Sequence, residues 1–388
     1  MKNEIHIAKK MISELFNREQ DDSLRRLPGA LDLIDFYSND YLGMAQNAVV
    51  KTAIQTALDK DSTFGATGSR MISGNREEME AFESFLASFH QSGKALLFNS
   101  GYAANQGLLS CMADRHDVII YDQLIHASLR EGLKLSLAAN FSFRHNDLSH
   151  LEQKLKLATG ALNQDKILIG RRVFVVVESV YSMDGDEAPL REIVELCEKY
   201  GAVLIVDEAH ATGILGHQGR GLVTGLGLAE RVWARIYTFG KALGGHGAAI
   251  CGPGYLIDYL INFSKPFIYT TALPWHSLAS VQAAYKEMQK GTALKALRKN
   301  IRFFTEQMPA SLRPLFIPSR SAIQSLVYPG NSAVRELAKT LQEHGFAVWP
   351  ILHPTVPKGQ ERLRICLHSF NTEEQIQALL EVIQQEIM

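Results

Sequence analysis

The residues with the clearest chemical potential in this 388-residue chain lie at the ends of two predicted strands. The apolar run 203–206 predicts a buried strand, and Asp207 and His210 follow its carboxyl end. A second short strand is predicted over residues 236–239, and it leads into Lys241 among glycines. This pair suits pyridoxal phosphate (PLP), because a lysine can form a Schiff base with the aldehyde while a carboxylate keeps the pyridine nitrogen protonated.

The sequence excludes two competing interpretations, a helicase-type ATPase and a dinucleotide-binding fold. Residues 207–210 spell Asp-Glu-Ala-His, which also occurs in helicase-type ATPases, but those enzymes need an upstream G-x-x-x-x-G-K-[ST] loop. The two Gly-Lys pairs, which contain Lys94 and Lys241, are both followed by alanine and offer no hydroxyl for Mg²⁺. A dinucleotide fold needs G-x-G-x-x-G after a first strand, and the glycines at 225 and 227 lack the third member.

The composition narrows the class of protein further. With 46% hydrophobic and 21% charged residues and a net charge of −1, the chain resembles an ordinary globular protein. It has no basic stretch, so we expect no nucleic-acid partner. It also lacks an apolar run of roughly 20 residues and a signal-peptide core, so we expect no membrane span and a cytoplasmic location. The four cysteines lack metal-ligand spacing, and we expect no metal site.

The pattern of elements predicts an α/β fold with a mainly parallel sheet flanked by helices. Short apolar runs without polar alternation are separated by helical patterns, which is typical of strands buried on both faces. A well-marked helix begins near Pro189 and ends before Gly201. The predicted strands of this part are residues 95–98, 118–121, 173–177, 203–206, 236–239 and 248–251.

After Pro274 the pattern changes to a smaller α+β unit. We predict a long helical region to residue 307, a helix over 332–343, and a final helix with a capping box at Thr372 and Gln375. Strands are predicted over residues 322–327, 346–350 and 362–367. The expected division is therefore an N-terminal amphipathic helical segment (1–37), a large PLP-binding domain (38–274) and a smaller C-terminal domain (275–388).

Several further residues are candidates for the cofactor site, and each also has an ordinary structural interpretation. Gly101 begins a predicted helix, where free N–H groups suit a phosphate, but a plain strand-to-helix turn has the same pattern. His126 could stack on a pyridine ring or serve only structure. Thr238 could donate its hydroxyl to a phosphate, and Glu178 follows a predicted strand where carboxylates often meet a ligand. Arg364 could pair with a substrate carboxylate or face water.

Segments spread along the chain and containing these residues, taken in order, resemble the α-oxoamine synthases, a branch of the fold-type I PLP enzymes. The resemblance extends over nearly the whole chain. One glycine-rich stretch departs from it, since residues 65–70 are GATGSR instead of the more glycine-rich form of the family. The matching segments are residues 38–43, 65–75, 99–105, 122–129, 178–190, 206–221, 238–248, 268–274 and 353–367.

The resemblance implies a role for each matching residue. Lys241 is expected to carry the cofactor, Asp207 to pair with the pyridine nitrogen, His210 to bind the phenolic oxygen, and His126 to stack on the ring. The phosphate is expected to contact Gly101, Tyr102 and Thr238, with Thr270 or Thr271 supplied by a neighbouring subunit of a homodimer. Side chains expected near the cofactor and the substrates are Asn39, Glu178, Ser182 and Arg364, the last binding the amino-acid carboxylate.

The resemblance also implies a reaction, the decarboxylative condensation of an amino acid with an acyl thioester on CoA or acyl carrier protein. The stretch PTVPKGQERLRI (354–365) favours the branch that joins L-alanine to a pimeloyl thioester in biotin synthesis. The alternative is a sister branch that uses glycine or serine with another acyl-CoA. A PLP-fold regulator without turnover is a third possibility, but the matching pattern begins at Ser38 and leaves no room before it for a DNA-binding domain.

Overall fold

The computed structural model describes residues 2–27, 29, 32–60, 65–160 and 171–388. The chain forms two compact units. The large unit consists of Asn39–Ser182 and Asp186–Arg298, in so far as these are described, and the small unit of the described residues before Asn39 with Met183–Gly185 and Lys299–Met388. The domain boundaries that we expected from the sequence, after residues 37 and 274, stay a prediction.

The large unit contains a seven-stranded sheet in the order β2-β8-β7-β6-β5-β3-β4. Among its described strands, β8 alone runs antiparallel to its neighbours, so the expected mainly parallel α/β sheet is confirmed. The strands are β2 (Lys94–Phe98), β3 (Val118–Asp122), β4 (Ala139–Phe143), β5 (Val173–Glu178), β6 (Val203–Asp207), β7 (Ala234–Thr238) and β8 (Ala248–Gly252).

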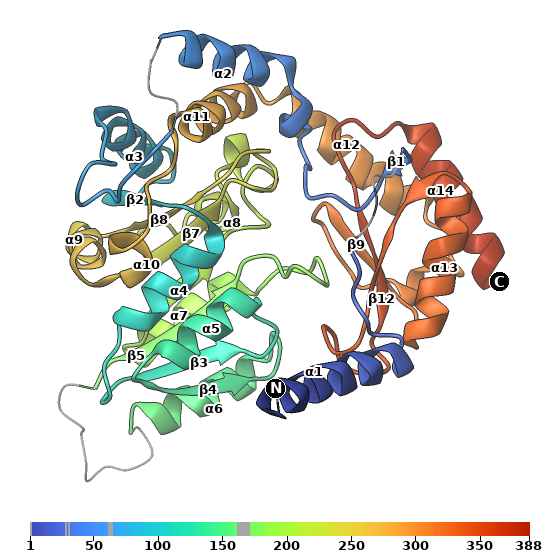
Figure 1. The fold of residues 1–388 in the computed structure, drawn as a ribbon, viewed down its shortest axis with the longest axis horizontal. Helices are drawn as coiled ribbons and strands as arrows, with labels where there is room; N and C mark the ends of the chain where they lie inside the picture. The colour runs from blue at the N-terminus through green and yellow to red at the C-terminus, as the bar shows by residue number, and fades with distance from the viewer. Residues whose placement is uncertain (1, 28, 30–31, 61–64, 161–170) are drawn as a thin grey trace. The chain divides into compact units, whose positions relative to one another are not determined.

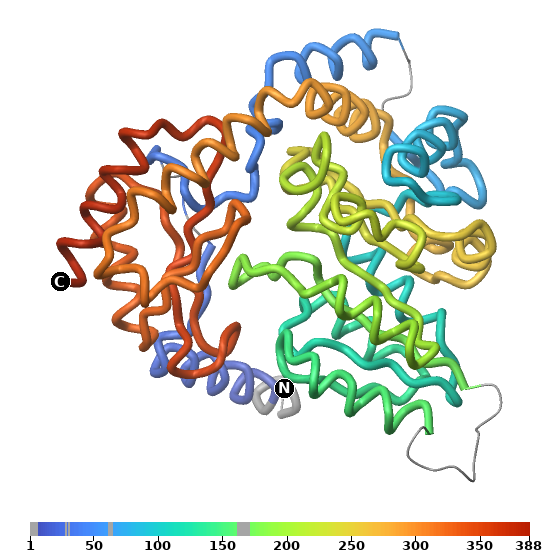
Figure 2. The backbone as a smooth tube through the Cα atoms, turned by 180° about the vertical axis from the view of Figure 1, so that it is seen from behind, coloured from blue at the N-terminus to red at the C-terminus, as the bar shows by residue number. Residues whose placement is uncertain are grey.

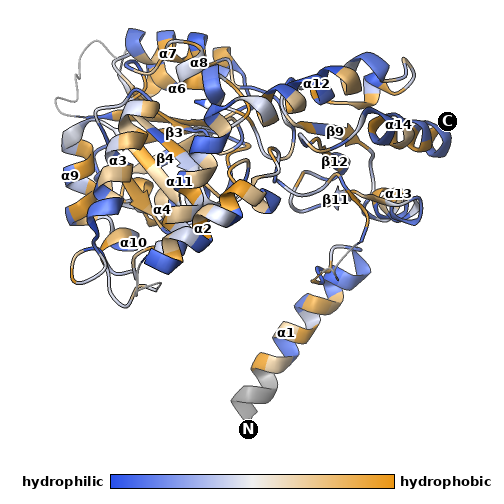
Figure 3. Ribbon diagram, turned by 90° about the horizontal axis from the view of Figure 1, so that it is seen from above, coloured by the Kyte–Doolittle hydropathy of each residue, from blue (hydrophilic) through white to orange (hydrophobic). Residues whose placement is uncertain are grey.

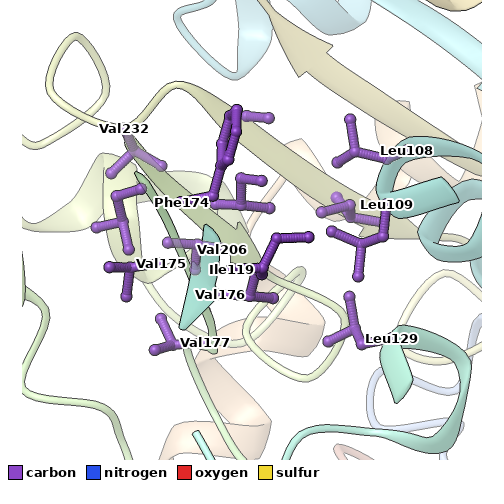
Figure 4. Packing of buried hydrophobic residues seen from close by; sticks show 14 of the residues in the cluster. Leu108, Leu109, Ile119, Leu129, Phe174, Val175, Val176, Val177, Val206 and Val232 are labelled. Carbon is purple, nitrogen blue, oxygen red and sulfur yellow. The ribbon is translucent and has the colours of Figure 1, made fainter. Parts of the chain in front are cut away.

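Six of these strands were predicted from their apolar runs, and β4 was missed. Four of the five β4 residues are exposed at the edge of the sheet, so the strand carries no continuous apolar signal. The central strands are different, because every residue of β5 is buried. Figure 4 shows Val175, Val176 and Val177 of β5 packed with side chains of neighbouring elements.

Helices flank this sheet (Figure 1). Helix α4 packs on β7 and β8, α6 on β3 and β4, and α7 on β6. The predicted apolar face of α7 is buried, and Gly201 behind the helix has φ +62°. The helices are α2 (Ala48–Lys60), α3 (Glu77–Phe89), α4 (Gly101–Cys111), α5 (Ala127–Leu135), α6 (Leu148–Ala158), α7 (Leu190–Lys199), α8 (Leu222–Gly225), α9 (Gly254–Phe263), α10 (Lys265–Ile268) and α11 (Trp275–Gln289), with 3-10 turns η1 (Met44–Gln46) and η2 (His217–Gly219).

The long helical region expected after Pro274 consists of two helices. Helix α11 ends at Gln289, and α12 (Thr292–Gln307) begins after a break. Gly291 lies in this break with φ +77°, a conformation that costs glycine little and interrupts the α-helical hydrogen bonds.

The small unit contains a three-stranded antiparallel sheet and a separate two-stranded parallel pair. The three-stranded sheet has the order β11 (Trp349–Ile351), β12 (Arg362–Cys366), β9 (Ile323–Val327). The strand expected over residues 346–350 is in fact two, because β10 (Phe346–Ala347) pairs with β1 (Ile34–Asp35) and only β11 joins β12. Figure 2 traces these segments, with α13 (Asn331–Glu343), η3 (Arg313–Leu315) and α14 (Glu373–Ile387).

Both ends of the small unit's chain are helical. The predicted capping box is present at the start of α14, where Thr372 and Gln375 exchange hydrogen bonds. At the other end, α1 (Lys2–Gln20) is the expected helix, and Met11, Ile12 and Leu15 on it are more than half exposed. Figure 3 shows apolar and polar residues alternating along α1. None of the described helices is long and apolar enough to cross a bilayer.

One ion cluster in the large unit has a consequence for stability. His145 Nδ1 lies 3.0 Å from Asp122 Oδ1, and His145 Nε2 lies 2.8 Å from Asp186 Oδ2. Burial opposes the charge, but the hydrogen bonds and charges of the two carboxylates outweigh it and raise the pKa of His145 to about 10. Because this lies above the unfolded value of about 6.5, the contribution is complete below about pH 6.5 and is lost as pH rises through about 10.

We therefore expect His145→Gln to lower the melting temperature at pH 6, with a loss of stability on the order of 3 kcal/mol, since it breaks a largely buried ion cluster. The difference from the wild type should shrink as pH approaches 10. Thermal unfolding followed by circular dichroism at both pH values measures this. The exposed His116→Gln serves as the control, and an equal loss at both pH values would contradict the assignment of charge to His145.

Candidate active site

A cavity of about 260 Å³ lies in the large unit, where the carboxyl ends of parallel strands meet. Glu178 and Asp207 are register partners at the ends of β5 and β6, and Thr238 ends β7. Parallel strands place their carboxyl ends along one edge of the sheet, which brings these side chains together. The predicted residues that line the cavity are Asn39, Gly101, Tyr102, His126, Glu178, Asp207, His210, Thr238 and Lys241.

Asp207 is buried and held by two donors. Its Oδ2 accepts a hydrogen bond from Asn105 Nδ2 at 2.7 Å, and its Oδ1 accepts one from the backbone N–H of Ala209 at 2.9 Å. Only 4% of the residue is exposed. A buried carboxylate without donors would be costly, and these two bonds fix its orientation while leaving further lone pairs for a ligand.

A hydrogen bond connects His126 and Glu178 at the start of α5. The backbone N–H of His126 donates to Glu178 Oε1, and His126 Nδ1 accepts from the backbone N–H of Ser128. Burial and the charge of Lys241 lower the pKa of His126, although Asp207 acts in the opposite direction. Burial and the neighbouring charge of Asp207 raise the pKa of Glu178 well above its usual value, so this carboxyl can hold a proton over a wide pH range.

The start of α4 lines the cavity and lies beside Thr238 at the end of β7. Ser100 precedes the helix and its hydroxyl accepts from the N–H of Ala103 at 3.1 Å. The Oγ1 of Thr238 is buried and has no hydrogen-bond partner among the described residues. A Cβ on Gly101 would lie 2.3 Å from Thr238 Cγ2, so a larger residue at this position would press on the Thr238 methyl group.

His210 belongs to a short chain of hydrogen bonds that ends at Asn39. The hydroxyl of Tyr41 lies 2.8 Å from His210 Nδ1 and donates to Asn39 Oδ1 at 2.9 Å. Because that hydroxyl proton is used on Asn39, its oxygen is left to accept from His210. Tyr41 thereby orients the imidazole that the sequence predicted as a cofactor contact.

Lys241 lies on the loop that joins β7 to β8, and two close approaches hold this loop. Gly244 donates its N–H to the carbonyl of Lys241 at 2.9 Å and has φ +57°. A Cβ on Gly244 would lie 2.2 Å from the backbone nitrogen of Ala45, so the loop packs directly against η1. The glycines around Lys241 therefore fix the position of its backbone.

Four of the predicted site residues do not line this cavity. Ser182 is buried in the large unit but does not line the cavity, and neither do Thr270 and Thr271. Asn99 Nδ2 donates to Thr270 Oγ1 at 3.1 Å and to the carbonyl of Thr271 at 2.5 Å. Arg364 belongs to the small unit and is 8% exposed, so the alternative that it faces water is wrong. The predicted ligand contacts of these four residues stay predictions.

Sequence reasoning missed several side chains at the site, among them Asn105, Ser128 and Tyr41. Asn105 lies four residues after Gly101, on the same face of α4, and that spacing was a usable signal. Ser128 lies two residues after His126, a common arrangement at helix starts that indicates no ligand by itself. Tyr41 comes near His210 only through the tertiary fold, so its role could not be read from spacing.

The comparisons with known proteins agree with this geometry. The model of the aminotransferase class I and II family matches residues 32–383. An 8-amino-7-oxononanoate synthase of Emericella nidulans is 39% identical over 96% of this chain and 94% of its own. The chain belongs to the α-oxoamine synthases, within the aminotransferase class I and II family. The resemblance found in the sequence is thus confirmed.

Solved structures support the same α-oxoamine synthase assignment. A serine palmitoyltransferase variant from S. paucimobilis, with a bound PLP–myriocin aldimine, superposes with a TM-score of 0.86 at 26% identity, covering 97% of this chain and 96% of that one. The 8-amino-7-oxononanoate synthase from Francisella tularensis gives a TM-score of 0.76 at 32% identity, with coverage of 92% and 98%. This α-oxoamine synthase is a PLP-dependent enzyme of the acyltransferase type.

The contact between Gly101 and Thr238 gives a prediction about packing. We expect Gly101→Ala to lower stability by about 1–3 kcal/mol, because the new methyl group meets Thr238 Cγ2. Adding Thr238→Ser removes that methyl group and should restore most of the loss. Chemical denaturation of the two variants measures the effect. Gly65→Ala, whose Cβ would meet no described atom within 4 Å, is the control, and failure of the double variant to recover would exclude this contact as the cause.

Proposed function

We propose that this α-oxoamine synthase condenses L-alanine with a pimeloyl thioester, releasing 8-amino-7-oxononanoate, CO2 and the free thiol carrier, in biotin synthesis. The proposal is supported by the names and identities of the relatives. The observation that carries the chemistry is the buried Asp207, held by two donors in the same cavity as Lys241. The carrier is CoA or acyl carrier protein.

The residues of the cavity fit PLP. Its volume of about 260 Å³ is near the lower end of small-molecule sites, which begin at roughly 300 Å³. The unpartnered hydroxyl of Thr238 and the free N–H groups at the start of α4 are donors that suit a phosphate. Asp207 suits a protonated pyridine nitrogen, and His210 suits the phenolic oxygen. We propose that Gly101, Tyr102 and Thr238 hold the phosphate, and that His126 stacks on the ring.

When bound, PLP supplies an aldehyde for amine attachment and a ring that accepts electrons from the substrate's α-carbon. The residues of the chain then have distinct tasks. Lys241 anchors the cofactor, and as a free amine it is the base that takes the α-proton of alanine. Asp207 keeps a proton on the ring nitrogen. Glu178, whose pKa is raised by burial, is placed to hold a proton beside His126.

We also propose where the substrates and a second subunit contribute. Asn39 and Ser182 are assigned to the substrate side, and Arg364 to the carboxylate of alanine. Arg364 is buried, which suits a charge-assisted contact better than a solvent-exposed role. We propose a homodimer in which the partner subunit's Thr270 or Thr271 reaches the phosphate, as the resemblance to the family implies. The four free cysteines support a reducing, cytoplasmic compartment.

A sister activity with serine or glycine is the second candidate. The observation in its favour is the superposition on serine palmitoyltransferase, whose TM-score of 0.86 exceeds the 0.76 of the Francisella tularensis synthase. Sequence identity favours alanine instead, with 39% to the Emericella nidulans synthase against 26% to that serine palmitoyltransferase. Overall superposition reflects the backbone of the whole chain, whereas amino-acid choice depends on a few side chains.

Release of free thiol from pimeloyl-CoA, assayed in parallel with alanine, glycine and serine, tests the proposal. We expect alanine to give the fastest release, by about 10-fold or more over either alternative, because one misplaced methyl or hydroxyl group costs about 1–3 kcal/mol in a closed site. Lys241→Ala should abolish the release together with the visible absorption band of the bound cofactor.

Lys265→Ala, which removes an exposed lysine of the large unit, is the matched control and should behave as the wild type. Faster thiol release with serine or glycine would move the enzyme to the sister branch. An absorption band that persists in Lys241→Ala would remove that lysine from its assigned role. Pimeloyl acyl carrier protein as a second thioester separates the two carriers.

A further inference from the structure

Asn105 and Ser128 connect two site residues that differ in charge, Asp207 on β6 and His126 before α5. Asn105 Nδ2 lies 2.7 Å from Asp207 Oδ2 and 3.0 Å from Ser128 Oγ. Ser128 Oγ in turn lies 2.7 Å from His126 Nδ1. Asn105 and Ser128 are 2% and 1% exposed, whereas His126 at the end of the chain is exposed. A continuous chain of hydrogen bonds therefore joins the buried carboxylate to the imidazole.

The chemistry of the groups fixes the direction of each bond. An ionised carboxylate only accepts, so Asn105 must turn its NH₂ group toward Asp207. The second hydrogen of that NH₂ group goes to Ser128 Oγ. The backbone N–H of Ser128 donates to His126 Nδ1 at 3.2 Å, so this nitrogen presents its lone pair. The Ser128 hydroxyl is therefore the donor in its own 2.7 Å bond to Nδ1, which accepts from two donors.

We propose that Asn105 and Ser128 are positioning residues that hold His126 as a neutral imidazole with its proton on Nε2. If Nδ1 were protonated, its N–H would point at the hydroxyl and the backbone N–H of Ser128, which are themselves donors. Each donor on Nδ1 stabilises the form in which that nitrogen keeps its lone pair. The geometry stands without a cofactor, and only the consequence for catalysis rests on the proposed function, in which His126 stacks on PLP.

The charged groups around His126 do not by themselves settle its protonation. Asp207 on β6 favours the imidazolium, whereas Lys241 on the β7–β8 loop and burial lower the pKa of His126. Glu178 on β5 accepts from the backbone N–H of His126 and, among the described residues, makes no hydrogen bond to the ring. The two donors on His126 Nδ1, the hydroxyl and the backbone N–H of Ser128, shift this balance toward the neutral ring. A neutral ring leaves the charge of Asp207 available for the pyridine nitrogen, which an imidazolium would compete for.

The test is the ¹⁵N spectrum of the histidine-labelled, PLP-loaded full chain, with His126 assigned by its loss in His126→Gln. We expect an unprotonated Nδ1 and a protonated Nε2 in the wild type from about pH 6 to pH 8. Ser128→Ala removes one donor and should raise the titration midpoint of His126 by about one pH unit, the equivalent of one net hydrogen bond. Ser128→Thr keeps the hydroxyl and should restore the wild-type midpoint.

Ser110→Ala on α4 is the matched control, because the Ser110 hydroxyl bonds only within its own helix, to the carbonyl of Gly107. Circular dichroism confirms that each variant is folded. A proton on Nδ1 in the wild type would overturn the proposal whatever the variants do, and so would a Ser128→Ala titration equal to that of the wild type. Neither result depends on which amino acid or thioester the enzyme turns over. Failure of this proposal about His126 is therefore distinct from failure of the proposed reaction.

Discussion

Burying a carboxylate at the end of a parallel strand is the constraint that shapes the site of this α-oxoamine synthase. Asp207 lies almost entirely out of solvent, where a charge without donors costs several kcal/mol or more. The fold supplies those donors from two elements, the Asn105 amide on α4 and the N–H of Ala209 that follows β6. Asn105 can reach Asp207 because α4 packs across β7, the strand next to β6.

The same packing places the other parts of the site. Since α4 begins beside Thr238, a side chain at position 101 would meet the Thr238 methyl group. The loop after β7 returns past η1 with a glycine in its turn, and that contact fixes the backbone near Lys241. Asp207, Thr238 and Lys241 therefore come from two neighbouring strand ends, and their separation is set by the spacing of the sheet. The carboxyl of Glu178 completes the row from the next strand.

Much of this arrangement could be predicted from the sequence, for identifiable physical reasons. Strands such as β5 and β6 are buried on both faces, so their apolar runs mark them clearly, and the polar residue that ends each run marks the site. β4 has exposed residues and gave no such signal. The separation of β10 from β11 depends on tertiary pairing, since β10 pairs with β1 and only β11 joins β12. The contact of Tyr41 with His210 was missed for the same reason, because hydrogen-bond partners distant in sequence leave no periodic pattern.

The central claim is that the charge of Asp207 holds a proton on the ring nitrogen of PLP. Its most direct test is Asp207→Asn, which keeps the size of the side chain and removes the charge. Thiol release from pimeloyl-CoA with alanine is measured alongside the visible absorption of the bound cofactor. The account predicts that the variant still binds PLP through Lys241 while thiol release falls on the order of 100-fold or more. Thiol release at the wild-type rate, with the cofactor bound, would contradict it.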